Sequence, residues 1–181
     1  MCGVSGFNWK STLCIEKMNK TIKHRGPDDE GIYIDEKVSL GHVRLSIIDL
    51  SSAGRQPMSN EDERVWIIYN GEIYNFLELR KKLEDKGHKF KSNTDSEVVL
   101  HAYEEWGYDC VKRFNGMWSF AIYDKNKDVL FLSRDRYGIK PLYYYWDGNR
   151  FIFSSEIKGI LQHEIDRVPN DKVIYEYLAF G

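Results

Sequence analysis

The sequence lacks the features that direct a protein to a membrane or to nucleic acid. Among its 181 residues no apolar run approaches the ~18 residues that a membrane-spanning helix needs. The net charge is only −2, which gives little attraction for phosphate backbones or anionic lipids. The first residues, Met1 and Cys2, are followed by neither a basic nor a long apolar stretch, so we expect no secretory signal and a cytoplasmic protein. We therefore expect neither a membrane nor nucleic acid as a partner.

Cysteine is also scarce. The three cysteines, Cys2, Cys14 and Cys110, form no C-x-x-C pair, and an odd number favours free thiols in a reducing compartment. The cysteines and the five histidines show no spacing typical of a metal site, so we predict no metal in this chain. Glycine loops of the G-x-x-x-x-G-K-[ST] and G-x-G-x-x-G types are missing too. We therefore expect neither ATP nor another cofactor to bind here.

The composition that remains, 42% hydrophobic and 30% charged residues, is that of a globular domain. Strand-like runs come first, two amphipathic segments with the pattern of capping boxes follow, and strands return before a short helix. The polar triplet after Tyr69 breaks a buried strand. This order predicts an α+β fold, a four-layer αββα sandwich. The expected strands are 3–7, 31–34, 38–43, 65–69, 117–123, 129–133, 142–146 and 150–153, and the expected helices begin after Asn75, after Thr94 and near Glu156.

The tail differs from the rest of the chain. It is polar from Leu161 to Asp171 and apolar again from Val173 to Phe180. We expect residues 1–165 to form one domain and 166–181 to be a linker and the start of a further domain that is absent. A natural stand-alone subunit is the alternative to an excised domain.

Cys2 has a chemical advantage if the initiator methionine is removed. The thiolate is the reactive form of cysteine, and an ordinary thiol with a pKa of ~8.5 is only slightly ionised at neutral pH. An α-amine has a pKa of about 7.7–8.0 and exchanges protons near neutrality. A terminal cysteine can thus supply both nucleophile and general base. The alternative is an incidental cysteine behind the start methionine.

Five further segments carry polar residues inside or between the expected strands and helices. They are HRGPDDEG (24–31), RLSIIDLS (44–51), YNGEIYN (69–75), TDSE (94–97) and RDRYGIKPLYY (134–144). In this order behind Cys2, they resemble the glutamine-hydrolysing domain of class II amidotransferases, the N-terminal-nucleophile hydrolases. The resemblance is greatest to the amino-terminal half of the glutamine-hydrolysing asparagine synthetase family, and it covers nearly the whole chain.

This resemblance implies a catalytic role for three residues. Cys2 would attack the side-chain amide of L-glutamine, form a γ-glutamyl thioester and release ammonia, and water would then release glutamate. The Asn70 side-chain amide and the Gly71 backbone N–H correspond to the donors that stabilise the oxyanion. The alternative for Asn70-Gly71 is a tight turn.

The resemblance also implies a pocket for the rest of glutamine. Arg44 corresponds to the residue that binds the α-carboxylate, for which a guanidinium fork is suited, and a surface ion pair is its alternative. Asp95 corresponds to the residue that receives the α-ammonium, although an Asp in a first helical turn also stabilises the helix dipole. Glu72 is a second candidate for the ammonium, and the backbone of Ile47 and Ile48 is expected to line the pocket.

The full-length members of that family contain a second domain that uses ATP and Mg²⁺ to adenylate aspartate, and its SGG-x-DS loop is missing here. The chain by itself should hydrolyse glutamine but not make asparagine, and its partner should be a synthetase domain or subunit that accepts the ammonia. Two alternatives stay open: a catalytically silent regulatory module that docks on a synthetase, and a different amide hydrolase on the same fold. We assign no catalysis to Arg25, Asp28, Asp29, Arg134, Asp135 and Arg136.

Overall fold

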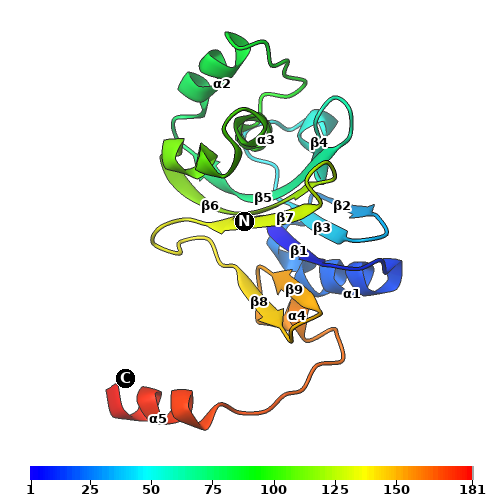
Figure 1. Ribbon diagram of the computed structural model, residues 1–181, viewed down its shortest axis with the longest axis vertical. Helices are drawn as coiled ribbons and strands as arrows, with labels where there is room; N and C mark the ends of the chain where they lie inside the picture. Colours follow the sequence, from blue (N-terminus) through cyan, green and yellow to red (C-terminus); the bar gives the residue numbers. More distant parts are fainter. Residues whose placement is uncertain (181) are drawn as a thin grey trace.

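The computed structural model describes residues 1–180, and its strands form two antiparallel sheets (Figure 1). Sheet A has the strand order β2-β3-β1-β9-β8, and sheet B has the order β4-β5-β6-β7. Sheet A consists of β1 (Gly3–Phe7), β2 (Asp29–Ile34), β3 (Ser39–Arg44), β8 (Tyr143–Trp146) and β9 (Phe151–Ser154). Sheet B consists of β4 (Met58–Ser59), β5 (Val65–Ile73), β6 (Gly116–Asp124) and β7 (Val129–Arg134).

Helices cover the outer face of each sheet. Helices α1 (Thr12–Ile22) and α4 (Ile157–Ile160) pack on sheet A, and α2 (Phe76–Glu84) and α3 (Asp95–Trp106) pack on sheet B. One hydrophobic cluster lies between the two sheets, and one lies between each sheet and its helices. This is a four-layer αββα sandwich, so the predicted fold is confirmed.

Burial follows from this layering. Every residue of β1 and β3 is buried, because α1 covers one face of these strands and sheet B covers the other. Strand β2 lies at the edge of the sheet and alternates between half-buried and exposed residues. Helix α1 was absent from the predicted order of elements, although its buried residues follow helical spacing. These are Ile15, Met18, Asn19 and Ile22.

Two local predictions were wrong. The strand does not break after Tyr69: β5 continues to Ile73, and Asn70 pairs with Ser119 of β6. The neighbouring strand provides a continuous ladder, so a polar side chain need not end β5. The side chain of Asn75 does not cap α2 either, because its Oδ1 accepts the N–H of Asn115 at 2.9 Å. The predicted cap at Thr94 is confirmed, since its Oγ1 accepts the Glu97 N–H at 3.3 Å.

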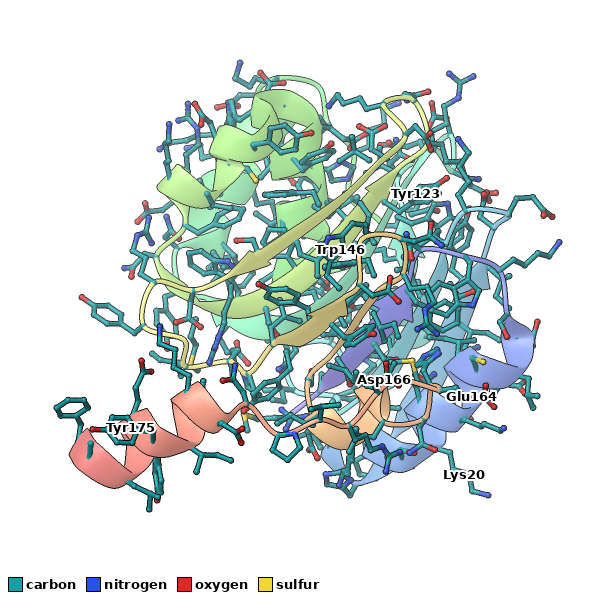
Figure 2. The ribbon with its side chains drawn as sticks, turned by 60° about the horizontal axis from the view of Figure 1, so that its bottom comes forward. Lys20, Tyr123, Trp146, Glu164, Asp166 and Tyr175 are labelled. Atoms are coloured by element: carbon teal, nitrogen blue, oxygen red, sulfur yellow. The ribbon has the colours of Figure 1, made fainter. Side chains whose placement is uncertain are left out.

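Helix α5 (Asp171–Phe180) lies apart from the sandwich at the end of an extended segment (Figures 1 and 2). All of its residues are exposed, including the apolar Val173, Tyr177 and Phe180. The division into 1–165 and 166–181 stays a prediction. Within residues 1–180, no helix is both long enough and apolar enough to cross a bilayer.

Candidate active site

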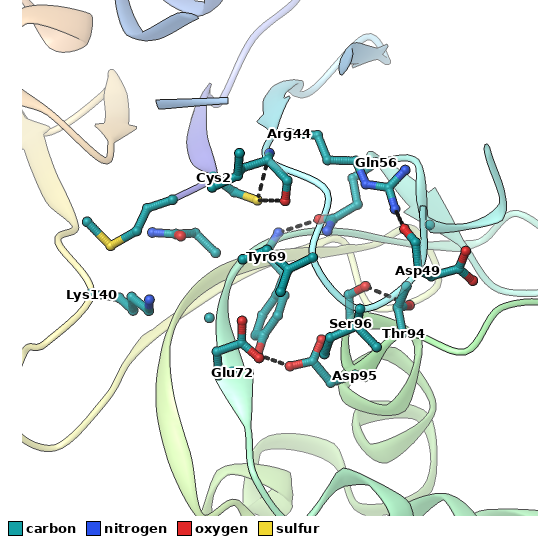
Figure 3. Close-up of a pocket in the computed structure, with 17 residues that line it drawn as sticks. Cys2, Arg44, Asp49, Gln56, Tyr69, Glu72, Thr94, Asp95, Ser96 and Lys140 are labelled. Carbon is teal, nitrogen blue, oxygen red and sulfur yellow. Dashed lines mark hydrogen bonds between the residues drawn. The ribbon is translucent and has the colours of Figure 1, made fainter. Parts of the chain in front are cut away.

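One pocket collects Cys2 and every other predicted site residue (Figure 3). Gly3 pairs with Val43 across β1 and β3, so Cys2 lies beside the residues that follow β3. The Leu45 N–H donates to Cys2 Sγ at 3.4 Å, and the thiol lies 3.6 Å from the Leu45 carbonyl oxygen. The other predicted residues that line the pocket are Arg44, Ile47, Ile48, Asn70, Gly71, Glu72 and Asp95.

The surroundings of the Cys2 sulfur act on its protonation in two directions. Burial raises the pKa of the thiol. The Leu45 N–H, the amino group of Met1, Arg44 and Lys140 all act to lower that pKa. Positive groups therefore surround a half-buried thiol, and they offset part of the cost of forming the thiolate.

Strand β5 offers a row of backbone groups along the edge that β6 does not cover. Tyr69 uses this edge twice: its N–H donates to Gln56 Oε1 at 2.6 Å, and its carbonyl accepts a hydrogen bond from His42 Nε2 at 3.0 Å. Further along, the Ile73 N–H donates to Asp95 Oδ2 at 2.9 Å. Gly71 lies between them, so its N–H faces the same edge, and no acceptor for it occurs among residues 1–180.

The side chain of Asn70 is a second donor without a partner. It is only 2% exposed, and its Nδ2 has no hydrogen-bond partner within residues 1–180. A buried amide of this kind is rare unless a ligand completes it. Gly71 is required next to it, because a Cβ would come within 2.6 Å of the Met117 carbonyl oxygen and 2.7 Å of the Tyr69 ring. Asn70 and Gly71 thus place two donors in the pocket of Cys2.

His42 supports this edge of β5 from sheet A. Within residues 1–180 its only hydrogen bond goes to the Tyr69 carbonyl oxygen, so Nε2 must carry the proton. Burial lowers the pKa of His42 to about 4, so the imidazole is neutral at physiological pH. A neutral ring holds the Tyr69 carbonyl without adding a charge beneath the pocket.

Two carboxylates form the opposite wall. Asp95, the first residue of α3, accepts the Tyr69 O–H at 2.6 Å as well as the Ile73 N–H, both through Oδ2. Burial raises the pKa of Asp95, and the hydrogen bond from Tyr69 opposes that shift. Burial and the charge of Asp95 also raise the pKa of Glu72, while Lys140 lowers it. This wall is suited to a cationic group such as an ammonium.

Arg44 is held in place by the loop that follows it. Its Nη1 donates to the Ser51 carbonyl at 2.8 Å, and its Nη2 donates to the Asp49 carbonyl. Gly54 leaves room for the guanidinium, since a Cβ there would lie 2.3 Å from Nη2. The loop therefore occupies part of the fork that the sequence assigned to a carboxylate, and the other N–H donors remain for a ligand.

Several residues of the site were missing from the sequence prediction. Lys140 lines the pocket, yet the motif that contains it received no role. Gln56 and His42 satisfy the backbone of a distant strand, and no local pattern marks such a partner. For Lys140 a signal existed, because a lysine in a motif between strands is a candidate for binding.

A second polar cluster lies away from the pocket. One possible ligand atom each from His88, His101 and Glu104 falls within 4.8 Å of the others, a grouping that spacing did not reveal. These groups already bond to one another, since His101 Nδ1 lies 2.7 Å from Glu104 Oε2. Burial alone would lower the pKa of His101, but hydrogen bonds to Glu104 and Glu97 raise it to about 9. A protonated histidine is a poor metal ligand, so we interpret the cluster as an ion-pair network.

Comparison with known proteins agrees with this geometry. The family described as "Glutamine amidotransferase domain" matches residues 1–181. The chain is 51% identical to the putative glutamine-hydrolysing asparagine synthetase 2 of Methanocaldococcus jannaschii, over 100% of this chain and 39% of that protein. It is 44% identical to the glutamine-hydrolysing asparagine synthetase 3 of Bacillus subtilis, over 90% of this chain and 28% of that protein.

The chain thus spans well under half the length of these relatives. Among solved structures, it resembles the glutamine phosphoribosylpyrophosphate amidotransferase of B. subtilis with a TM-score of 0.75. That match covers 88% of this chain and 43% of the other at 20% identity, so it supports the fold alone. With a family match over its whole length and close relatives among the synthetases, this chain belongs to the glutamine amidotransferase domain family.

Proposed function

We propose that this chain hydrolyses L-glutamine to glutamate and ammonia, with Cys2 as the nucleophile. The observation that carries the proposal is the pair of unpartnered donors, Asn70 Nδ2 and Gly71 N–H, in the pocket of the Cys2 thiol. Donors held in this way can stabilise an oxyanion without reorganising during the reaction. The full-length homologues named as glutamine-hydrolysing enzymes support the same reaction.

The first half of the reaction forms a thioester. Once Met1 is removed, the α-amine of Cys2 accepts the thiol proton, directly or through a water molecule. The thiolate attacks the amide carbon of glutamine, and the carbonyl π electrons move to oxygen. Asn70 Nδ2 and Gly71 N–H donate to that oxyanion. When it collapses, the C–N bond breaks, and the leaving nitrogen takes the proton from the α-amine to depart as ammonia.

The second half regenerates the enzyme. A water molecule gives a proton to the α-amine as its oxygen attacks the thioester carbon. The same donors stabilise the second oxyanion, and its collapse breaks the C–S bond. The sulfur recovers a proton, and glutamate leaves. The sum is glutamine plus water giving glutamate plus ammonia, and no cofactor is needed for it in this chain.

The remaining pocket residues would bind the amino-acid end of glutamine. We assign the α-carboxylate to Arg44 and the α-ammonium to Asp95, with Glu72 as a second contact. Ile47 and Ile48 would contact the ligand through their backbone. This division is supported by charge, because the cation of Arg44 and the two carboxylates line the same pocket.

The ammonia would be used by a synthetase domain or subunit. The matched part makes up only 39% and 28% of the two relatives, which leaves room in them for such a partner domain. We propose that the complete enzyme converts aspartate to asparagine, in the cytoplasm, and that ATP and Mg²⁺ bind in the synthetase part.

The experiment measures glutamate release from glutamine by the purified chain, with Cys2→Ala as the matched control. Intact mass establishes first that Met1 is absent, because a retained methionine blocks the amine. The expected result is release by the wild type and none by the variant. A folded, Met1-free wild type that stays inert even beside its synthetase part would contradict the proposal and indicate a silent domain.

A further inference from the structure

The segment 134–140 between β7 and β8 is built around one carboxylate. Asp135 accepts backbone N–H groups from four residues, and this arrangement curls the chain into a compact loop. The donors are Trp118 at 3.2 Å, Tyr137 at 3.1 Å, Ile139 at 2.9 Å and Lys140 at 2.9 Å. Arg134 closes the loop, since its Nε donates to the Lys140 carbonyl at 2.8 Å. The peptide groups on both sides of the Lys140 α-carbon are thus fixed.

The side chain that this loop positions is an ammonium group with no partner. Lys140 is 6% exposed and lines the Cys2 pocket. Among residues 1–180, no carboxylate lies within 4.0 Å of its Nζ, and its Nζ donates no hydrogen bond. The Lys140 side chain is mostly covered, but its Nζ is not fully buried, so the ammonium is available to the groups that line the pocket.

The charges around Cys2 divide by position. Figure 3 shows Lys140 and Arg44 on opposite sides of Cys2, with Glu72 and Asp95 below it. Arg44 comes from the end of β3 and Lys140 from the loop after β7, while the acidic groups come from β5 and α3. Tyr69 of β5 also lines the pocket, and the chain's amino group is the remaining cation near the sulfur. The Arg44 guanidinium is bonded to its own loop, whereas the Lys140 ammonium has no hydrogen-bond or ion-pair partner among residues 1–180.

We propose that Lys140 adds to the positive charge around Cys2 and favours its thiolate, because its ammonium, unlike the guanidinium of Arg44, is not held by carbonyl groups of its own loop. It acts through Cys2 and is a positioning residue for charge rather than a group that transfers protons. The proposal rests on the proposed glutaminase function, but its effect on the thiol exists without glutamine. The motif RDRYGIKPLYY then has a purpose: Arg134 and Asp135 fold the loop, and the loop aims Lys140.

The experiment measures the rate at which iodoacetamide alkylates Cys2 as a function of pH, in Met1-free protein, by peptide mass spectrometry. Lys140→Met removes the charge while keeping the length, Lys140→Arg retains it, and Lys127→Met removes an ammonium that does not line the pocket. Cys14, which is half-buried and does not line the pocket, serves as an internal reference. Melting temperature is recorded for each variant.

The expected result is that Lys140→Met moves the midpoint of Cys2 alkylation up by about 0.5 to 1 pH unit, as for the loss of one positive charge from a shared pocket. Lys140→Arg keeps the charge, so its alkylation midpoint should stay close to that of the wild type. Lys127→Met should leave the midpoint unchanged. The melting temperature of Lys140→Met should not fall, because no ion pair is broken.

Two outcomes would overturn the proposal. One is an unchanged alkylation midpoint in a folded Lys140→Met variant. The other is a fall in melting temperature without a shift, which would assign Lys140 to structure. Glutamate release measured in parallel keeps the two proposals apart: an inert wild type with the shift present contradicts only the glutaminase, and an active enzyme without the shift contradicts only the role of Lys140.

Discussion

The first turn of α3 contributes to two polar regions. They differ in whether their buried polar groups have hydrogen-bond partners within the chain. Asp95 faces the Cys2 pocket, where the buried Asn70 Nδ2 has no hydrogen-bond partner within residues 1–180. Two residues further on, Glu97 accepts hydrogen bonds from the N–H groups of Lys91 and Ser92. The first region keeps donors ready for a ligand, and the second consumes them within the chain. The comparison therefore separates a buried donor that is available to a ligand from carboxylate oxygens that are already bonded within the chain.

The largest effect should come from the pocket. Asn70→Ala removes one oxyanion donor and should lower the rate of glutamate release by about 10²- to 10³-fold. Because Nδ2 bonds to nothing in the described chain, the melting temperature should hardly change. Steady-state kinetics and a thermal melt check both. If Asn70→Ala lowered the melting temperature but kept the rate of glutamate release, Asn70 would have a structural role, and the difference between the two regions would be contradicted.

The ion-pair network around His101 should show the reverse, a loss of stability with little loss of activity. His101 is buried between Glu104 and Glu97, with its Nε2 3.8 Å from Glu97 Oε1. His101→Gln leaves these carboxylates without their cation and should lower the free energy of unfolding by about 3 kcal/mol. Urea denaturation measures this loss, and kcat/KM for glutamine should change little. A large fall in activity at unchanged stability would show that the two regions are coupled through α3.

Arg44 is useful for this comparison because it is bonded within the chain and also lines the pocket. Its guanidinium holds the Asp49 and Ser51 carbonyls and also lines the pocket. Arg44→Lys keeps the charge but loses the fork, so the KM for glutamine should rise roughly 10-fold, as for one charge-assisted hydrogen bond of about 1.5–3 kcal/mol. The kcat should fall less. If kcat instead fell by as large a factor as KM rose, the result would indicate that the loop after β3 has lost its structure.

The smallest expected effect is the pH dependence of the stability that His101 and Glu97 contribute. The pKa of His101 is about 9 against an ordinary 6.5, so its contribution to stability is complete below pH 6.5 and is lost as pH rises through 9. Burial would raise the pKa of Glu97, but hydrogen bonds from His101 and Ser92 lower it to about 2 against an ordinary 4.5. Its contribution is complete above pH 4.5 and is lost as pH falls toward 2.

Unfolding measured between pH 5 and pH 10 should therefore show a decline above pH 7 in the wild type. His101→Gln should lack most of that decline, and Lys127→Met should retain it. Identical profiles in wild type and His101→Gln would refute the assigned protonation.

Much of the site could be predicted because its signals are local. Cys2 is recognised by its position in the chain, and Thr94 caps α3 through a residue three positions away. The polar triplet at Asn70 lies in the same pocket as Cys2, but the prediction that it breaks the strand was wrong. Its pairing with Ser119 of β6 connects residues far apart in the sequence, and spacing along one segment cannot report such a partner.

By itself, the sequence determined the order of the motifs and the αββα layering and predicted a nucleophile, since each depends on residue type and spacing along the chain. Only the tertiary structure decided which buried groups are satisfied. Gln56 accepts the Tyr69 N–H and His42 donates to the Tyr69 carbonyl, both from distant segments. The Lys140 ammonium has no ion-pair or hydrogen-bond partner among residues 1–180. The physical reason is that hydrogen bonding and charge pairing are properties of neighbours in space, and folding selects those neighbours from all parts of the chain.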